Sequence, residues 1–375
     1  MPVASRPRNS LIRTEVGRVL RVDRVRPGAQ ETTVLVGDRE ERAVNFPQLL
    51  GEVRVNEVVL LNTTAVRAGL GTGGCHFVMR RADHERPASE GKGHVVKLRY
   101  TPLQFRCLTV EEQESPYREA IEACQDLEDM PVIVAGLHSQ IAPAAAAVKA
   151  LLPASRVAYV MTDTAALPLS FSRLVQNLKE AALLEATITV GQAFGGDYEA
   201  VNVFTGLLAA RAVVGAQVAI VAQGPGNVGT ETEWGFGSIS QGDHLNAVGA
   251  LGGLPIAVPR ISFADPRPRH RGVSRQSLVA LGRVALTRAV VSLPEMDPEK
   301  LEFVRRQLDD EGITERHEVL IARGDLGVAE LSARGVEAET MGRSPEDDPE
   351  FFLAAGAAGA IAAARLTWTE SSEND

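Results

Sequence analysis

From Pro131 onward, the chain repeats a short apolar run followed by an amphipathic stretch. The runs lack the alternation of a strand with one solvated face, which indicates strands buried on both faces. Such strands, alternating with helices, predict a parallel sheet covered by helices. The expected strands are 132–135, 157–161, 186–190, 218–222, 256–261, 289–292 and 318–321, with a further candidate at 336–339.

The stretches between and after these runs have helical spacing. They are 143–152, 170–182, 199–214, 243–251, 274–287, 297–311, 326–333 and 348–365. Asp297 at the cap, Pro298 in the first turn and Gly312 at the end delimit the clearest of them. The last helix is rich in Ala and Gly, which predicts close helix packing and leaves a homodimer contact open.

The first hundred residues have a different pattern. Short alternating runs at 15–25, 32–36, 42–46, 57–61 and 76–80 are separated by Gly and Pro, as in a small antiparallel barrel or sandwich. A polar stretch at 80–97 reads as a connector. We therefore expect an α/β protein in which a small β-barrel-like domain (1–105) precedes a doubly wound, mostly parallel sheet domain (106–375).

Composition limits the partners. A net charge of −9 over 375 residues argues against broad nucleic-acid binding. No uninterrupted apolar run reaches the roughly 18 residues of a membrane helix, so no membrane partner is expected. Cys75, Cys107 and Cys124 are odd in number and form no CxxC pair, which fits a reducing cytoplasm.

In open α/β sheets, ligands bind beyond the carboxyl ends of the strands. Polar residues follow nearly every expected strand, and this concentration predicts the site. Among them are His138, Ser139, Asp163, Gln192, Asp197, Asp265 and Arg343.

The stretch 217–244 contains a glycine-rich loop directly after an expected strand. Its candidate ligand-binding residues are Gly224, Gly226, Asn227, Gly229 and Thr230. The GPGNVG run matches the dinucleotide pattern formally, but TETEWGFGS is a poor helix start and Asp265 comes too late for the ribose acid. A dinucleotide is therefore not expected; an anion cradle of another kind and a purely structural loop stay open.

Two acids behind this loop, Glu231 and Glu233, would repel a phosphate unless a metal or an arginine neutralised them. Arg267, Arg269 and Arg271 form a stiff basic segment between and after two prolines. Guanidinium groups suit carboxylate or phosphate, so a small anionic ligand is one interpretation. The other is a surface loop paired with the chain's own acids.

His138, His244 and His270 lie at strand ends or in the loops and helices that follow, where an imidazole can move protons near neutral pH. We expect His138 or His270 as the catalytic acid or base, oriented by Asp163 or Asp265; His244 is a ligand-binding candidate. A hydrogen-bonded structural histidine is the alternative at each position. No HExxH, CxxC or HxH spacing is present, so the cofactor is unassigned, with a divalent metal left open.

Several blocks of the chain are distinctive: LNTTAVRAGLGTGG, GPGNVGT with the following WGFG, GDHLNAVGALGG, RISFADPRPRHRGVS and ETMGRSPEDDPEFFLAAGAAG. On these blocks the chain resembles a bacterial family, domain-of-unknown-function family 3866. The family loop reads GPGxVGTGT, whereas this chain has Glu231 in place of the last glycine; Ser274, Arg275 and Gln276 replace an SHH-like run. The resemblance implies the location of a site and no established activity.

Two functions remain open on the sequence alone. One is an enzyme that acts on a small anionic metabolite. The other is a non-catalytic sensor or scaffold, whose α/β domain binds the metabolite while the β domain contacts a partner.

Overall fold

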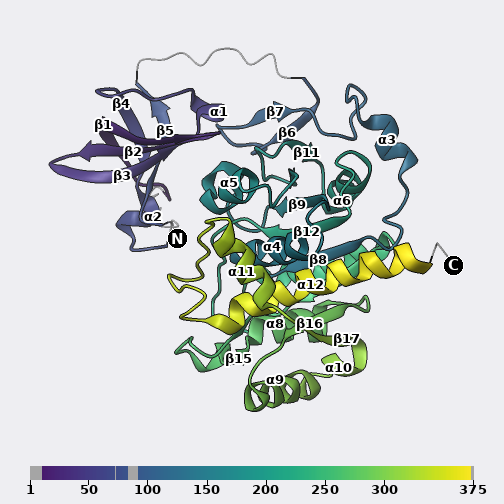
Figure 1. Cartoon of the computed structure of the whole chain (residues 1–375). Helices are drawn as coiled ribbons and strands as arrows, with labels where there is room; N and C mark the ends of the chain where they lie inside the picture. Colours follow the sequence, from purple (N-terminus) through teal and green to yellow (C-terminus); the bar gives the residue numbers. More distant parts are fainter. Residues whose placement is uncertain (1–10, 72, 83–91, 373–375) are drawn as a thin grey trace, which may run out of the picture. The chain divides into compact units, whose positions relative to one another are not determined.

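The computed structural model describes residues 11–71, 73–82 and 92–372, with side chains described as far as residue 367. The chain divides into two compact units, Met1–Glu90 and Gly91–Asp375, whose elements are labelled in Figure 1. The boundary predicted after residue 105 lies within the second unit. Residues 83–91 of the predicted connector lie outside the described residues.

The first unit contains a closed five-stranded barrel with the strand order β1-β2-β3-β5-β4. Its elements are β1 (Thr14–Arg26), β2 (Ala29–Val36), β3 (Arg39–Asn45), α1 (Pro47–Leu50), β4 (Val58–Asn62), α2 (Thr64–Arg67) and β5 (His76–Arg81). The predicted β-rich domain is thus a barrel and not a sandwich. Its pairs are antiparallel except for β3 with β5, which run parallel at Ala43 and His76.

Arg67 ties the strands of this barrel together. Its guanidinium donates to Glu15 on β1 and to Glu41 on β3, at 2.7–2.9 Å. These hydrogen bonds lower the pKa of Glu15 to about 2. Nε2 of His76, on β5, lies 2.6 Å from Glu41. Charged side chains therefore link strands that are far apart in the sequence.

The second unit is built on an eight-stranded sheet with the order β11-β10-β9-β12-β8-β13-β16-β17. The strands are β8 (Pro131–Ala135), β9 (Val157–Thr162), β10 (Ala186–Val190), β11 (Tyr198–Ala200), β12 (Val218–Gln223), β13 (Leu254–Val258), β16 (Val290–Pro294) and β17 (Glu318–Ala322). Every neighbouring pair runs parallel. This confirms the predicted α/β fold with a parallel sheet.

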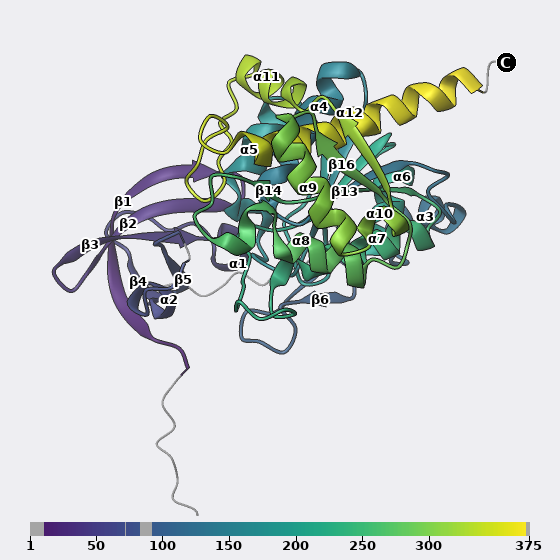
Figure 2. The ribbon, with the colours of Figure 1, turned by 90° about the horizontal axis from the view of Figure 1, so that it is seen from below.

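Helices cover both faces of the sheet, as Figure 2 also shows. One face packs against α4 (Ile141–Leu151), α5 (Arg173–Glu180), α11 (Asp325–Ala333) and α12 (Pro349–Ser372). The other packs against α3 (Arg118–Ala123), α6 (Val203–Ala212), α7 (Ser240–Ala250), α8 (Arg275–Val279), α9 (Pro298–Asp310) and α10 (Ile313–Arg316). The sheet is doubly wound because its two apolar faces must both be kept from water.

The order of the strands reverses around β8. The chain leaves β8 through α4 on one face, whereas it leaves the neighbouring strands β12 and β13 through α7 and α8 on the other. Connections that diverge to opposite faces open a crevice at the carboxyl ends of the strands. The ends of β8, β9, β12 and β13 therefore form the part of the sheet edge on which a site is expected.

Glycines allow α12 to lie directly against its neighbours α4 and α11 (Figure 1). A Cβ on Gly356 would come within 2.2 Å of the Gly324 carbonyl oxygen, and one on Gly359 within 2.2 Å of the Ala144 carbonyl oxygen. The small residues of the last helix thus serve close packing, as predicted. By length and composition alone, Pro349–Thr367 of α12 could cross a membrane, in contrast to the expectation from the uninterrupted apolar runs. However, this stretch is 72% buried inside the structure, as in a core helix.

Three local predictions were wrong. Residues 336–339 form no strand. The helix expected from residue 199 begins at Val203, because Tyr198–Ala200 pairs with β10 as the edge strand β11. The strand expected to run to residue 261 ends at Val258, and Ile261–Ser262 (β14) pairs instead with Gly272–Val273 (β15).

A buried lysine fixes the start of the second unit to its sheet. Lys97 ends β6 (Val95–Lys97), which pairs with β7 (Phe105–Cys107). Its fully buried ammonium group donates to the Ala193 carbonyl oxygen at 2.5 Å and forms an ion pair with Glu199 on β11. A buried charge needs such a partner, because the unpaired ion would lose its hydration without compensation.

Replacing Lys97 by Met is therefore expected to lower the free energy of unfolding by about 3–5 kcal/mol, since Glu199 would be left without its partner. The double variant K97M/E199Q should recover part of this loss. Urea denaturation followed by circular dichroism measures both. The matched control is Arg323→Gln, which breaks an ion pair with Asp325 whose side chains are 58% and 56% exposed; its expected cost is below about 1 kcal/mol. Equal losses for K97M and R323Q would contradict the assignment.

Candidate functional site

His138 lies directly beyond β8, in the single turn η1 (His138–Gln140) that precedes α4. Its Nδ1 is 3.2 Å from the backbone carbonyl oxygen of Gln223 and 3.2 Å from the Tyr159 hydroxyl. Its Nε2 is 2.6 Å from Oγ of Ser172. Burial lowers the pKa of His138 to about 4, so the imidazole is neutral at pH 7.

The contacts of His138 assign its tautomer. A backbone carbonyl only accepts, so Nδ1 carries the proton that is donated toward Gln223. In the neutral ring, Nε2 then accepts, and the Ser172 hydroxyl donates to it. Tyr159 donates in turn to the carbonyl oxygens of Ala222 and Gln223.

Sequence reasoning missed both Ser172 and Tyr159. Ser172 caps α5, since its Oγ accepts from the Val175 backbone N–H at 3.1 Å; a serine before an amphipathic run is a cap signal that could have been read. Tyr159 lies within the buried strand β9, and no sequence signal indicates where its hydroxyl points.

Gln223 and Gln241 hold the central strand ends in place. The Gln223 side chain donates to the Gly136 carbonyl oxygen and accepts from Thr164. Nε2 of Gln241, on α7, donates to the carbonyl oxygens of Val134 and Val258 at 2.9 Å each, which bridges β8 and β13. Buried side-chain amides thus satisfy backbone carbonyl groups at the ends of the strands.

The glycine-rich loop forms a hairpin that closes on itself. Thr230 N–H donates to the Gly235 carbonyl oxygen, and Gly237 N–H donates to that of Val228. Asn227 Oδ1 accepts from the Ser238 backbone N–H at 2.9 Å. Gly229 belongs to this hairpin, where it forms a bridge with Phe236.

Two glycines of the loop have structural reasons: at Gly224 the backbone lies too close to Ala166 for a side chain, and at Gly226 the backbone conformation favours glycine. A Cβ on Gly224 would come within 2.4 Å of the Ala166 carbonyl oxygen, and Gly226 has φ +100°. The loop leads into the hairpin before α7 begins at Ser240, and not directly into a helix as in a dinucleotide fingerprint.

His244 lies on α7 and is 8% exposed. Burial lowers its pKa to about 4, against an opposing effect of the Asp163 charge. Among the described residues, neither its Nδ1 nor Oγ1 of Thr162, at the end of β9, has a hydrogen-bond partner. Asp163 is exposed and accepts from the Gln192 backbone N–H at 2.8 Å. Asp163 and Gln192 follow the ends of β9 and β10, so they lie at the carboxyl end of the sheet.

Asp197 is not brought to this edge. Its carboxylate accepts from the backbone N–H and the hydroxyl of Thr187, close to the start of β10, and from Lys179. It therefore lies toward the amino ends of the strands, where it fixes the turn before β11.

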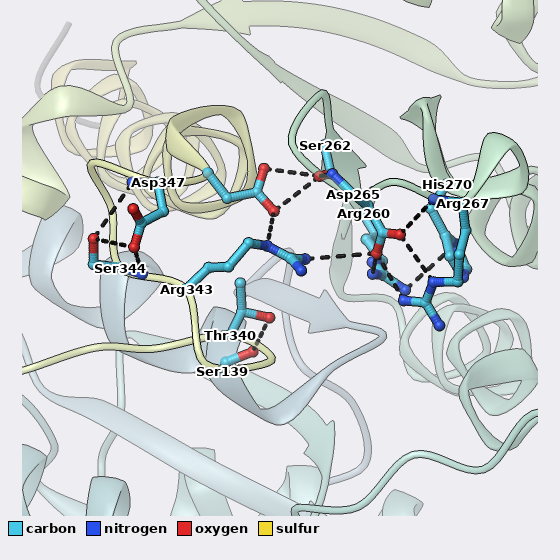
Figure 3. A network of polar contacts seen from close by, with 11 residues as sticks. Ser139, Arg260, Ser262, Asp265, Arg267, His270, Thr340, Arg343, Ser344 and Asp347 are labelled. Atoms are coloured by element: carbon cyan, nitrogen blue, oxygen red, sulfur yellow. Dashed lines mark hydrogen bonds and ion pairs between the residues drawn. The ribbon is translucent and has the colours of Figure 1, made fainter.

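Arginine side chains converge on Asp265, beyond β13 (Figure 3). Asp265 accepts from Arg260 at 2.8 Å and from Nε and Nη2 of Arg267 at 2.8 and 2.7 Å. Arg343 Nη2 lies 3.5 Å away, and Arg343 Nε donates to Asp348 at 3.0 Å. The hydrogen bonds from Arg267 hold the pKa of Asp265 far below its usual range. We call Arg260, Arg267, Arg343, Asp265 and Asp348 the arginine cluster.

Within the arginine cluster, three guanidinium groups face two fully buried carboxylates, while the charges of the exposed Asp347 and Glu231 act on Arg343 and Arg267 from outside it. Nε of Arg260 and Nη2 of Arg343 are buried without a hydrogen-bond acceptor among the described residues. Ser262 donates to Asp348 at 2.8 Å. The cluster thereby joins the loop after β13 to the loop before α12.

His270 lies behind the cluster and is 2% exposed. Its Nδ1 accepts from the hydroxyl of Ser274 at 2.8 Å and lies 3.4 Å from Arg260. Burial, with the charge of Arg260, lowers its pKa to about 4. His270 therefore lies within hydrogen-bond reach of both Ser274 and Arg260.

Arg269 and Arg271 have other partners. Arg269 forms an ion pair with Glu231 at 2.8 Å, and the Arg271 guanidinium lies over the ring of Phe303. Glu233 pairs with Arg275 and Arg283. The acids behind the glycine-rich loop are thus neutralised by arginines.

Ser139 connects the two parts of the edge. Its hydroxyl donates to Oγ1 of Thr340 at 3.3 Å (Figure 3). The backbones of Thr340 and Arg343 in turn form an isolated antiparallel β-bridge. Since Ser139 follows His138, the histidine and the arginine cluster lie along one continuous edge. In the described part of the chain, no group of three or more His, Cys, Asp or Glu residues could hold a metal ion.

A family model described as protein of unknown function (DUF3866) matches residues 42–359. Because this match spans most of the chain, the chain belongs to that family, and the resemblance inferred from its sequence blocks is confirmed. A search of curated proteins found no match.

Replacing Asp265 by Asn is expected to lower the free energy of unfolding by about 3–5 kcal/mol, because Arg260 would remain buried without its carboxylate. Guanidinium denaturation measures the loss. Asp325→Asn, in an exposed pair, is the control and should cost less than about 1 kcal/mol. If D265N were as stable as D325N, the cluster would not be the tie between its two loops.

Because the pKa values of three buried histidines are lowered, the stability of the fold is expected to depend on pH. His138, His244 and His270 have pKa values of about 4 in the folded chain against an ordinary 6.5. Between these values the unfolded chain binds more protons, so the free energy of unfolding falls as the pH drops from 7.5 to 5. Each pKa unit corresponds to about 1.4 kcal/mol at most. His138→Gln should flatten the pH profile of Tm, whereas His94→Gln, at a 77% exposed side chain, should not; identical profiles would refute the contribution of His138.

Proposed function

We propose that this member of the DUF3866 family binds a small anionic molecule, a carboxylate or a phosphate, at the carboxyl edge of its parallel sheet. The ligand would lie between η1 and the arginine cluster. The observation that carries the proposal is the unbalanced charge of the cluster, in which three guanidinium groups face two carboxylates.

The hydrogen bonding and the exposure of the individual guanidinium groups support this proposal. Nε of Arg260 has no hydrogen-bond acceptor among the described residues, and Nη2 of Arg343 has only the 3.5 Å ion pair with Asp265. A charged donor without a hydrogen bond costs more than a neutral one. The side chains of Arg343 and Arg267 are also 21% and 37% exposed. An anion at this point would add the missing negative charge and accept from a planar donor fork.

The surroundings of Arg343 favour an anion as well. The hydroxyls of Ser139 and Thr340 lie beside it, and hydroxyls donate readily to carboxylate or phosphate oxygens. η1 leads directly into the eleven-residue helix α4, whose N-terminal peptide groups carry partial positive charge. In open α/β sheets, ligands bind beyond the carboxyl ends of the strands where the strand order reverses, which also favours this edge.

Two arginines near the cluster and the three cysteines also bear on this proposal. Because Arg269 pairs with Glu231 and Arg271 lies over Phe303, this proposal assigns the ligand contacts to Arg260, Arg267 and Arg343 instead. The three free cysteines fit a location in a reducing cytoplasm, which belongs to the same proposal.

Titration with inorganic phosphate and with succinate at low ionic strength tests the proposal. Wild type should show saturable binding by calorimetry and a matching rise in Tm. Arg343→Gln should weaken binding at least tenfold, about 1.4 kcal/mol, because one charge-assisted donor fork is lost. Arg343→Lys should fall between the two.

The matched control is Arg306→Gln on α9, whose side chain is 71% exposed. It removes the same charge away from the cluster and should bind both anions as wild type does. Absence of saturable binding in wild type, or equal weakening in R343Q and R306Q, would refute the proposal.

A further inference from the structure

The hydrogen bond between Ser172 and His138 has the geometry of an activated hydroxyl. Oγ and Nε2 are 2.6 Å apart. The backbone carbonyl of Gln223 holds the ring proton on Nδ1, so Nε2 offers its lone pair to the hydroxyl. A serine that donates to a neutral, oriented imidazole is the arrangement that makes a hydroxyl nucleophilic.

The imidazole is also held in place from its other side. The Tyr159 hydroxyl lies 3.2 Å from Nδ1, and the two rings meet edge to face. Because the backbone oxygens of Ala222 and Gln223 in turn accept from Tyr159, the orientation of His138 depends on the end of β12. Burial, which lowers the pKa of His138 to about 4, keeps Nε2 unprotonated at neutral pH, so that it accepts the hydrogen bond from Ser172.

The position of Ser172 suits a developing negative charge. Its Oγ accepts from the Val175 backbone N–H at the start of α5. That N–H would stabilise an oxygen that loses its proton, as donors at a helix start do. Of the two neighbours of Oγ, His138 would remove the proton and the Val175 N–H would stabilise the oxygen.

We propose that Ser172 is a nucleophile, activated by His138, for esters of small anionic acids. This deepens the proposed function and rests on it for the choice of acid. The arginine cluster would hold the distal carboxylate, since Ser139, next to His138, contacts Thr340 beside Arg343. Both ends of such an ester would then meet groups on the same edge of the sheet.

The reaction is balanced by the groups present and water. Ser172 Oγ forms a bond to the ester carbonyl carbon while its proton passes to His138 Nε2. The carbon–oxygen bond to the alcohol then breaks, and the alcohol leaves with that proton. Water attacks the resulting ester of Ser172, gives one proton to Nε2 and displaces Oγ, which recovers the proton as the acid is released. No oxidant, reductant or metal enters the scheme.

The first test uses phenylmethanesulfonyl fluoride, a small reagent chosen because Ser172 is 6% exposed. Its sulfur would bond to Oγ with loss of fluoride, and mass spectrometry of peptides should find the adduct on Ser172 in wild type. S172A should remove labelling and H138Q should slow it at least a hundredfold. Ser332→Ala, at an exposed serine of α11, should label as wild type does.

Loss of the α5 cap could unfold S172A, so Ser172→Asn is tested beside it. Asn preserves capping but removes the hydroxyl, and a folded S172N must also resist labelling. Thermal unfolding verifies the fold of each variant. Absence of the adduct on Ser172 in folded wild type, or equal labelling of folded H138Q, would overturn the assignment of the nucleophile.

The second test separates the nucleophile from the anion site. Wild type should hydrolyse the mono-4-nitrophenyl ester of succinate at least tenfold faster, in kcat/KM, than 4-nitrophenyl acetate. R343Q should lose this preference through a higher KM for the anionic ester, whereas the control R306Q should keep both the preference and the labelling of Ser172 by the sulfonyl fluoride. Labelling without a preference for the anionic ester would overturn the substrate class; phosphate binding without labelling would overturn the nucleophile and leave the anion site standing.

Discussion

The second unit depends on one constraint: a parallel sheet whose two faces must both be hidden from water. The strands therefore alternate with crossover helices, which pack against two separate apolar clusters. Crossovers of a single hand send the chain to opposite faces on either side of β8. Helix starts and polar strand ends then meet at one edge, so the position of the candidate site is a consequence of hiding the sheet.

Buried charge is the second organising interaction. The barrel pairs Arg67 with Glu15 and Glu41, and the second unit pairs Lys97 with Glu199. Neither group has a positive charge left over, since Arg67 faces two carboxylates and Lys97 faces one, which suits ties between segments distant in sequence. The arginine cluster differs because one positive charge is left over. That difference distinguishes a structural tie from a group that would also accept an anionic ligand.

The proposed binding and the proposed chemistry rest on separate groups along the same edge. The arginine cluster orders the loops after β13 and before α12, whereas His138 depends on β9, β12 and the cap of α5. Ser139, next to His138 in the sequence, donates to Thr340, which pairs with Arg343. A sensor would need only the first group. An enzyme would need both, with the imidazole kept neutral by burial.

The sequence by itself determined the fold class, nearly every strand of the sheet and the edge on which polar residues gather, because these follow from local apolar periodicity and strand direction. It did not determine which side chains meet. Asp197 lies toward the amino ends, since Thr187 and Lys179 hold it there, and Arg269 pairs with Glu231. Ser172 and Tyr159 reach His138 only through the packing of α5 and β9 against β8 and β12. Contacts between residues tens of positions apart depend on register and crossover geometry, which a one-dimensional pattern does not contain; only the tertiary structure decided them.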